Sequence, residues 1–323
     1  METGQELEPV PATGWSATDG SQVAYTHPRS RKGQTMRIVG IKRLHDSCGV
    51  EVAALIEEQK QVSVIAPLAD FWADPTGHLS RPPTGRTLAL ADVELVPPVL
   101  PDARVFCIGL NYAEHAAEGS FRDQDLPPYP TLFARWTQSL TVDGAEVPVP
   151  SNEEGLDWEG EVVAWVGTPL VDATPEAAVQ AVIGYSTFND LTARKAQKLT
   201  TQWSLGKNGD RSGPIGPMVP AAEVGDLKDG RRLRTRVNGE TVQDASTSQM
   251  IYGVGETLSL ISHTLSLRPG DLLATGTPSG VGYARTPPQL LQPGDTVEVE
   301  VEGLGILRNA VVGNHCRSVS TAI

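Results

Sequence analysis

Short runs of apolar and alternating residues, separated by turn-forming residues, are the main pattern along the chain. Three such runs, at residues 36–41, 50–56 and 61–66, predict β-strands, because successive side chains of a strand point to opposite faces. They lie close together in the sequence and are separated by short polar segments. We therefore predict a small β-rich N-terminal domain over residues 36–96.

A larger domain is predicted after a proline-rich linker, Pro97-Pro98-Val99-Leu100-Pro101. This linker is expected to be stiff, because each proline fixes its own φ and lacks an N–H donor. The main domain, residues 100–317, again consists mostly of short strands between Gly and Pro turns. Strand patterns are clear at Val105–Leu110, at Leu233–Val237 before the hairpin signal Asn238-Gly239, and at Thr296–Val301.

Helical periodicity is convincing in only a few places. A short helix is predicted at residues 175–178 after the cap Thr174, a helical turn from Asp190 to Gln197, and an amphipathic helix from Gly253 to Ser262. Strands thus predominate, and the predicted fold class is α+β, mainly β. Residues 1–35 are rich in Gly, Pro, Ser, Thr and charge, and they are predicted to form a disordered extension.

Charge and composition exclude several classes of function. The chain has 323 residues and a formal net charge of −13, so the basic surface that binds nucleic-acid phosphates is missing. No apolar segment reaches the length of a membrane span and no signal-peptide pattern opens the chain, so we expect a cytoplasmic protein without a membrane partner. Cys48, Cys107 and Cys316 are widely spaced and indicate neither a disulfide framework nor a zinc cluster.

Two glutamates before an apolar strand form the first candidate site. Glu159 and Glu161 share one face of a strand, because Gly160 between them points to the other face. Neighbouring carboxylates repel each other unless a cation is present, and their hard oxygens suit Mg²⁺, Mn²⁺ or Ca²⁺. A solvated strand edge is the alternative for a bare Glu-x-Glu. The apolar run Val162–Val166 that follows favours the rim of a core.

A second candidate follows the strand at 105–110. His115 and Glu118 are three residues apart, so one helical turn would place them on the same face. A carboxylate beside an imidazole orients the ring and raises its basicity, as in a general base. The alternatives are an ordinary surface pair and metal ligation by both residues.

A third group of polar residues lies between residues 184 and 208. Asp190 fits either a helix N-cap or a third carboxylate ligand at a strand end. Arg194 and Gln197 could face a substrate carboxylate, which a guanidinium binds with two parallel hydrogen bonds. Lys207, in a glycine-flanked loop, could be either a solvated charge or a charge clamp.

A glycine-rich turn ends the last candidate segment, Gly270 to Gly282. Its backbone N–H groups and the Thr277 hydroxyl would suit anionic oxygens. It is not a P-loop, because the Lys-Ser/Thr pair after the last glycine is missing. Taken alone, it is a tight turn.

Together these segments resemble the fumarylacetoacetate hydrolase family. The match covers roughly residues 100–315, in family order, and consists of Gly109-Leu110-Asn111-Tyr112 through His115 and Glu118, Asp157-Trp158-Glu159-Gly160-Glu161, Gly184-Tyr185 through Asn189-Asp190 and Arg194, Gly206-Lys207, Ile215-Gly216-Pro217, Val237-Asn238-Gly239-Glu240, and Leu267-Arg268-Pro269-Gly270-Asp271 through Thr275 to Gly282. The resemblance implies a mixed β-sandwich roll with short helices, usually a homodimer, with one divalent cation per subunit.

The resemblance also implies roles for individual residues. The metal, Mg²⁺ or Mn²⁺ with Ca²⁺ as a further option, would be held by Glu159, Glu161 and Asp190. His115 and Glu118 would form a catalytic dyad on a flexible lid, and Lys207 would stabilise developing negative charge. The substrate would be held by Arg194, Gln197, Thr277, Gly276, Tyr112 and Arg135. At Arg135 the family usually has a lysine, so the charge is kept but the shape is not, and residues 208–213 also depart from the family pattern.

Three functions follow from this resemblance. The leading prediction is a metal-dependent hydrolase that cleaves a C–C bond in an acylpyruvate-like or β-diketo acid: the metal would stabilise an enolate and the dyad would activate water. The alternative is decarboxylation of an oxaloacetate-like acid, or keto–enol isomerisation, at the same site. The third is a non-catalytic protein that kept the fold.

Overall fold

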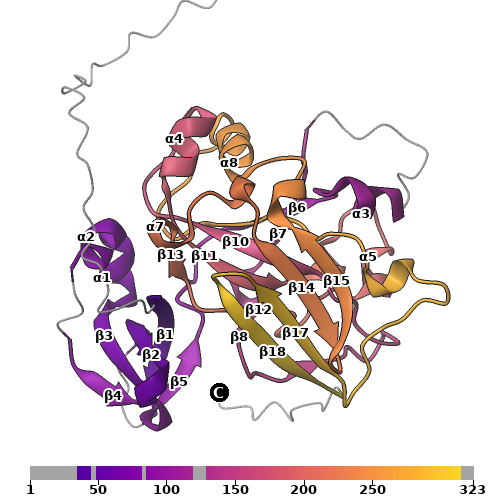
Figure 1. Cartoon of the computed structure of the whole chain (residues 1–323), viewed down its shortest axis with the longest axis horizontal. Helices are drawn as coiled ribbons and strands as arrows, with labels where there is room; N and C mark the ends of the chain where they lie inside the picture. Colours follow the sequence, from indigo (N-terminus) through magenta and orange to yellow (C-terminus); the bar gives the residue numbers. More distant parts are fainter. Residues whose placement is uncertain (1–34, 45–48, 82–84, 119–128, 314–323) are drawn as a thin grey trace, which may run out of the picture.

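The computed structural model describes residues 35–44, 49–81, 85–118 and 129–313. Apart from Thr35, the predicted N-terminal extension lies outside these residues, as do Cys48 and Cys316. Figure 1 shows a small sheet with two helices beside a larger body built of curled sheets. The fold is mainly β with short helices, as the sequence predicts.

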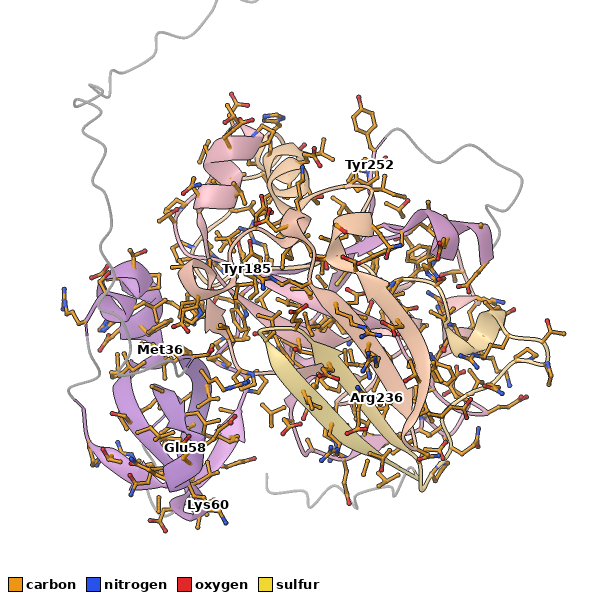
Figure 2. All side chains as sticks on the ribbon, viewed as in Figure 1. Met36, Glu58, Lys60, Tyr185, Arg236 and Tyr252 are labelled. Carbon is orange, nitrogen blue, oxygen red and sulfur yellow. The ribbon has the colours of Figure 1, made fainter. Side chains whose placement is uncertain are left out.

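The N-terminal part is a five-stranded antiparallel sheet in the order β4-β3-β2-β1-β5. Its strands are β1 (Arg37–Arg43), β2 (Glu51–Ile56), β3 (Gln61–Pro67), β4 (Thr87–Ala89) and β5 (Val93–Val96). Figure 2 places Glu58 and Lys60 at the turn between β2 and β3. Two short helices that the sequence analysis missed follow β3, namely α1 (Leu68–Ala73) and α2 (Pro75–Leu79).

The larger body contains two further sheets. The first has the order β7-β6-β16-β10-β11-β12-β8, with β13 paired to β11, and the second has the order β15-β14-β17-β18-β9. The strands of the first sheet are β6 (Val105–Gly109), β7 (Thr131–Arg135), β8 (Leu140–Val142), β10 (Gly160–Val166), β11 (Val182–Asn189), β12 (Gly213–Ile215), β13 (Val219–Pro220) and β16 (Leu272–Ala274). Those of the second are β9 (Val147–Pro148), β14 (Arg232–Val237), β15 (Glu240–Ser246), β17 (Thr296–Val301) and β18 (Gly305–Val312).

Among the described residues of this part, six short α-helices accompany the sheets. They are α3 (Ala113–Glu118), α4 (Pro175–Gln180), α5 (Arg194–Gln197), α6 (Ser204–Lys207), α7 (Ala221–Val224) and α8 (Val254–Ser262). Figure 1 shows α4 and α8 side by side at the top of the molecule. Within the described part of the chain, no helix is long and apolar enough to cross a membrane.

Strand β10 lies at the centre of the larger sheet, and all seven of its residues are buried. On one face, Val162 and Ala164 belong to a core shared with α4 and α8. On the other, Val163 and Trp165 belong to a core shared with the N-terminal sheet. Glu161 is on the same face as Val163, because side chains alternate along a strand. The carboxylates therefore lie at the end of this second core.

The N-terminal part joins the body through this core. Trp72 of α1 stacks on Trp165 with ring centroids 5.7 Å apart, and its Nε1 donates to the Pro98 carbonyl at 2.8 Å. The proline segment is thus tied to both parts. The boundaries at residues 36–96 and 100–317 stay predictions, because one buried cluster crosses them.

Several local predictions are confirmed. Asn238 and Gly239 form the hairpin turn between β14 and β15 with φ of 51° and 85°, as a two-residue turn with positive φ requires. The Thr174 hydroxyl caps α4 by accepting the N–H of Ala177 at 3.3 Å.

On the outer face of the second sheet, Arg236, labelled in Figure 2, pairs with Glu300 at 2.5 Å.

One local prediction is wrong. The segment from Asp190 to Gln197 is helical only over α5, whose N-cap is Ala193, so Asp190 does not cap a helix. The backbone N–H of Asp190 instead donates to the Glu159 carbonyl at 2.9 Å and continues the pairing of β10 with β11. The strand pairing therefore extends past the point where the helix was expected to begin.

We predict that Trp72→Ala lowers the free energy of unfolding by about 3–5 kcal/mol, the usual cost of emptying a buried tryptophan site. Chemical denaturation would measure this loss. Trp136→Ala is the control: that side chain is 56% exposed, and the change should be within about 0.5 kcal/mol. A Trp72→Ala variant as stable as the control would contradict a core shared by both parts.

Candidate active site

Three carboxylates converge where β10 and β11 meet. Gly160 pairs with Asn189 in the antiparallel register, which sets Glu159 opposite Asp190, and Glu161 follows two residues along β10. Glu159, Glu161 and Asp190 each offer an oxygen within 4.8 Å of the others, and all three are buried. We call these residues the carboxylate cluster. The strand register thus brings together the three residues that the sequence proposed as metal ligands.

Three cations surround the cluster. Lys207 Nζ donates to Glu159 Oε2 at 2.6 Å and to Asp190 Oδ2 at 2.7 Å. Arg194 pairs with Glu159 Oε1 at 2.6 Å and with Asp157 Oδ2 at 2.7 Å. Arg135 pairs with Asp190. Buried charges persist only when they are paired and hydrogen-bonded, and this network meets that condition.

Burial and neighbouring charges shift the pKa values of the two glutamates in opposite directions. Burial alone would raise the pKa of Glu159, but Lys207 and Arg194 outweigh it and lower this pKa to about 2. For Glu161, burial and then the charges of Asp190 and Glu159 raise the pKa well above its usual value. Without a cation, Glu161 therefore favours its protonated form beside an ionised Glu159.

The donor set fits a hard divalent cation. All three groups offer carboxylate oxygens, which Mg²⁺ and Mn²⁺ prefer, and a bound cation would offset the burial and the carboxylate repulsion that raise the pKa of Glu161. Glu161 is oriented for this role by the N–H of Gly276, which donates to its Oε2 at 2.9 Å. Calcium would be accepted by the same oxygens.

Residues 276–283, here called the glycine turn, contact the cluster and its neighbours. The Thr277 hydroxyl donates to the Gly160 carbonyl at 2.9 Å, and the Gly282 N–H donates to Asp157 at 2.7 Å. Gly276 and Gly280 have φ of 86° and 99°, a region that favours glycine. The turn therefore follows the surface of the cluster closely.

The dyad predicted from the sequence is formed on α3. His115 Nδ1 lies 3.3 Å from Glu118 Oε2, and both side chains are partly exposed. The Gly280 N–H of the glycine turn donates to Glu118 Oε1 at 2.9 Å. The Gly276 N–H of the same turn donates to Glu161 at 2.9 Å. The glycine turn thus links the dyad to the carboxylate cluster.

The residues predicted to bind substrate fall into two groups. Arg194 and Gln197 lie together, with the guanidinium donating to Gln197 Oε1 at 3.0 Å, and Arg194 contacts the cluster directly. The Gly276 N–H is taken by Glu161, and the Thr277 hydroxyl donates to Gly160 while it accepts from Gln243. Gly276 and Thr277 therefore hold the segment that carries the proposed metal ligands Glu159 and Glu161.

Tyr112 and Arg135 differ most from the expectation. Tyr112 is buried, and its hydroxyl has no hydrogen-bond partner among the described residues. Arg135 is 2% exposed, and its guanidinium is taken up by Asp190, Ser139, Ser212 and the Leu191 carbonyl. Arg135 thus supports Asp190, and its contact with substrate stays a prediction.

Sequence reasoning gave no role to Asp157 or Gln243. Asp157 is buried and accepts from Arg194, Gly282 and Tyr283, while Gln243 lies between β10 and the glycine turn. Asp157 stands beside Glu159 in the sequence, and that proximity was a usable signal. For Gln243, one of several polar residues in β15, the sequence offered none.

The fold and the site define a class: a mainly β protein with a buried three-carboxylate centre and an adjoining His–Glu pair. The family model described as "Fumarylacetoacetate (FAA) hydrolase C-terminal" matches residues 104–312. The chain therefore belongs to the fumarylacetoacetate hydrolase family.

Two relatives with similar sequences are both named as oxaloacetate tautomerases. Oxaloacetate tautomerase YisK of Bacillus subtilis (strain 168) is 35% identical over 270 residues, which are 81% of this chain and 86% of YisK. The mitochondrial oxaloacetate tautomerase fahd2 of Xenopus laevis is 33% identical over 227 residues, 70% of each chain.

Two solved structures add to this comparison. The crystal structure of 2-hydroxyhepta-2,4-diene-1,7-dioate isomerase from Mycobacterium marinum is 32% identical, with a TM-score of 0.69, over 87% of this chain and 99% of that one. The crystal structure of fumarylpyruvate hydrolase from Pseudomonas aeruginosa in complex with Mn²⁺ and pyruvate is 34% identical, with a TM-score of 0.59, over 68% and 91%. These relatives are named as a hydrolase, an isomerase and tautomerases.

We predict that Glu161→Gln raises the melting temperature of metal-free protein at neutral pH. The raised pKa means that folded protein holds a proton that unfolded protein loses above its ordinary value of 4.5, so stability falls as pH rises above that value. Glutamine removes this cost, and the difference should shrink as pH falls towards 4.5. Thermal unfolding in EDTA across this range would measure it.

The same variant should lose most of the melting-temperature rise that Mg²⁺ or Mn²⁺ gives to the unaltered protein, because a ligand that binds only the folded state stabilises it. Glu94→Gln, on an exposed position of β5, is the control and should change neither quantity. A Glu161→Gln variant less stable than the unaltered protein at every pH in EDTA would refute the assigned protonation.

Proposed function

We propose that the protein is a divalent-metal-dependent enzyme that interconverts the keto and enol forms of an oxaloacetate-like 2-oxo acid. The observation that carries this proposal is the His115–Glu118 pair, held by the glycine turn beside the carboxylate cluster. The names of two relatives, both oxaloacetate tautomerases, support this choice of reaction over others of the family.

The chemistry divides between the cation and the chain. A cation held by Glu159, Glu161 and Asp190 would supply a Lewis acid for the adjacent oxygens of a 2-oxo acid, which acidifies the neighbouring C–H. Lys207 and Arg194 keep positive charge at the cluster. Burial alone would lower the pKa of Lys207, but Asp190 and Glu159 outweigh it and raise this pKa, so the ammonium stays charged.

The dyad supplies the proton transfer. Glu118 holds His115 through Nδ1, so Nε2 is the nitrogen that can exchange a proton with substrate. In the keto-to-enol direction, the imidazole removes a proton from the carbon next to the oxo group. The C–C double bond forms as the carbonyl π electrons move to oxygen, and the imidazolium then gives its proton to that oxygen. Each turnover thus restores the neutral imidazole, and the reverse direction runs the same transfers backwards.

C–C bond hydrolysis is the second candidate. The 34% identical fumarylpyruvate hydrolase, whose crystal structure is a complex with Mn²⁺ and pyruvate, supports it. Here His115, again oriented by Glu118, would take a proton from a water molecule that attacks the remote carbonyl of an acylpyruvate. Hydrolysis yields two acids, whereas tautomerisation leaves the mass unchanged, so product analysis separates the two. Decarboxylation would be recognised in the same assay by release of CO₂.

We predict that His115→Ala and Glu118→Gln each reduce kcat for oxaloacetate tautomerisation, by about 10²–10⁴-fold for the histidine, the usual contribution of a general acid–base residue. The ultraviolet absorbance of the enol follows the rate. Neither change should weaken Mn²⁺ binding, because neither side chain belongs to the carboxylate cluster.

His263→Ala is the matched control. This histidine lies at the exposed C-terminal end of α8, and its loss should leave kcat unchanged. Full activity of His115→Ala would remove the dyad from the mechanism. An unaltered protein that cleaves acylpyruvates but does not tautomerise oxaloacetate would favour the second candidate.

A further inference from the structure

Gln243 of β15 joins parts of the site that come from three distant segments. It is 2% exposed, although an amide side chain is costly to bury unless its polar atoms are paired. Its Oε1 accepts two hydrogen bonds and its Nε2 donates two. The side chain therefore uses its full hydrogen-bonding capacity inside the protein.

On one side, Gln243 holds the segment that carries two of the carboxylates. Its Oε1 accepts the N–H of Gly160 at 3.0 Å and the hydroxyl of Thr235 at 2.7 Å. Gly160 stands between Glu159 and Glu161, and a Cβ at this glycine would lie 2.3 Å from Thr235 Oγ1. The backbone between the two glutamates is thus pressed against β14 and fixed there by Gln243.

On the other side, Gln243 holds the glycine turn. Its Nε2 donates to the Thr277 hydroxyl and to the Pro278 carbonyl, each at 2.9 Å. Gly276, one residue before Thr277, donates to Glu161, and Gly280, two residues after Pro278, donates to Glu118. The segment held by Gln243 is therefore flanked by the donors that orient one cluster carboxylate and the dyad.

We infer that Gln243 is a positioning residue that fixes the position of the carboxylate cluster relative to the His115–Glu118 dyad. Neither part contacts Gln243 directly, and it acts through Gly160 and through the glycine turn. Residues that orient metal ligands typically contribute about 10–100-fold to metal affinity or activity. The part of this inference that concerns turnover rests on the proposed function, whereas the part that concerns metal affinity does not.

The test compares Gln243→Leu with Asn309→Leu. Leucine lacks all four hydrogen bonds of Gln243. Asn309 is a second buried amide, 1% exposed, whose Nδ2 donates to the Val142 and Ala145 carbonyls on β8 and the loop after it. Both variants lose buried hydrogen bonds, so both should melt at lower temperature than the unaltered protein. Of these two residues, only Gln243 hydrogen-bonds both to Gly160 and to the glycine turn.

Two readouts distinguish positioning from general stability. Calorimetric titration with Mn²⁺ should give a dissociation constant at least about tenfold weaker for Gln243→Leu and unchanged for Asn309→Leu. At saturating Mn²⁺ and oxaloacetate, kcat should fall at least about tenfold for Gln243→Leu alone. A Gln243→Leu variant that melts lower but keeps both values would overturn the inference. If the unaltered protein is inactive on oxaloacetate, the proposed function fails, yet the Mn²⁺ titration still decides the role of Gln243.

Gln243→Glu provides a second route should the leucine variant not fold. Its carboxylate can still accept from Gly160 and Thr235 but cannot donate to the Pro278 carbonyl. We expect Mn²⁺ affinity to be kept or increased, because a negative charge is added near the cation, while kcat falls. An unchanged kcat in this variant would equally overturn the inference.

Discussion

The compensation of buried negative charge at the end of β10 is the constraint on which the rest of this structure depends. Glu159, Glu161 and Asp190 meet in the interior because the register of β10 and β11 fixes them there. Uncompensated carboxylates would not stay ionised in such a place. Lys207 and two arginines supply the compensation, and each of them comes from an element outside this strand pair. A cation would complete the balance.

Other parts of the fold pack around this centre. The N-terminal sheet, through Trp72 against Trp165, buries the face of β10 that carries Glu161. The glycine turn contacts both the cluster and Glu118. The carboxylates of the cluster therefore lie where β10 and β11 meet, while the dyad lies on the short helix α3 with both side chains partly exposed.

The amino-acid sequence predicted correctly those features that depend on residues close together in the chain. The Asn238-Gly239 hairpin and the cap at Thr174 depend on neighbouring residues, and the Glu-x-Glu spacing follows from strand alternation. Roles set by distant segments were harder to predict. Asp190 looked like a helix cap because its strand partner Glu159 is far away in the sequence. Arg135 and Gln243 could not be placed, because periodicity gives the face of a strand but not what packs against it.

Calorimetric titration of oxalate into metal-stripped protein, repeated after loading with Mn²⁺, tests the central claim most directly. Oxalate presents two adjacent oxygen donors, as a 2-oxo acid does. A cation held by Glu159, Glu161 and Asp190 should be required to bind it, because Lys207, Arg194 and Arg135 are already paired with carboxylates. We predict that oxalate binds only in the presence of Mn²⁺. Equal binding with and without the metal, or none in either case, would contradict it.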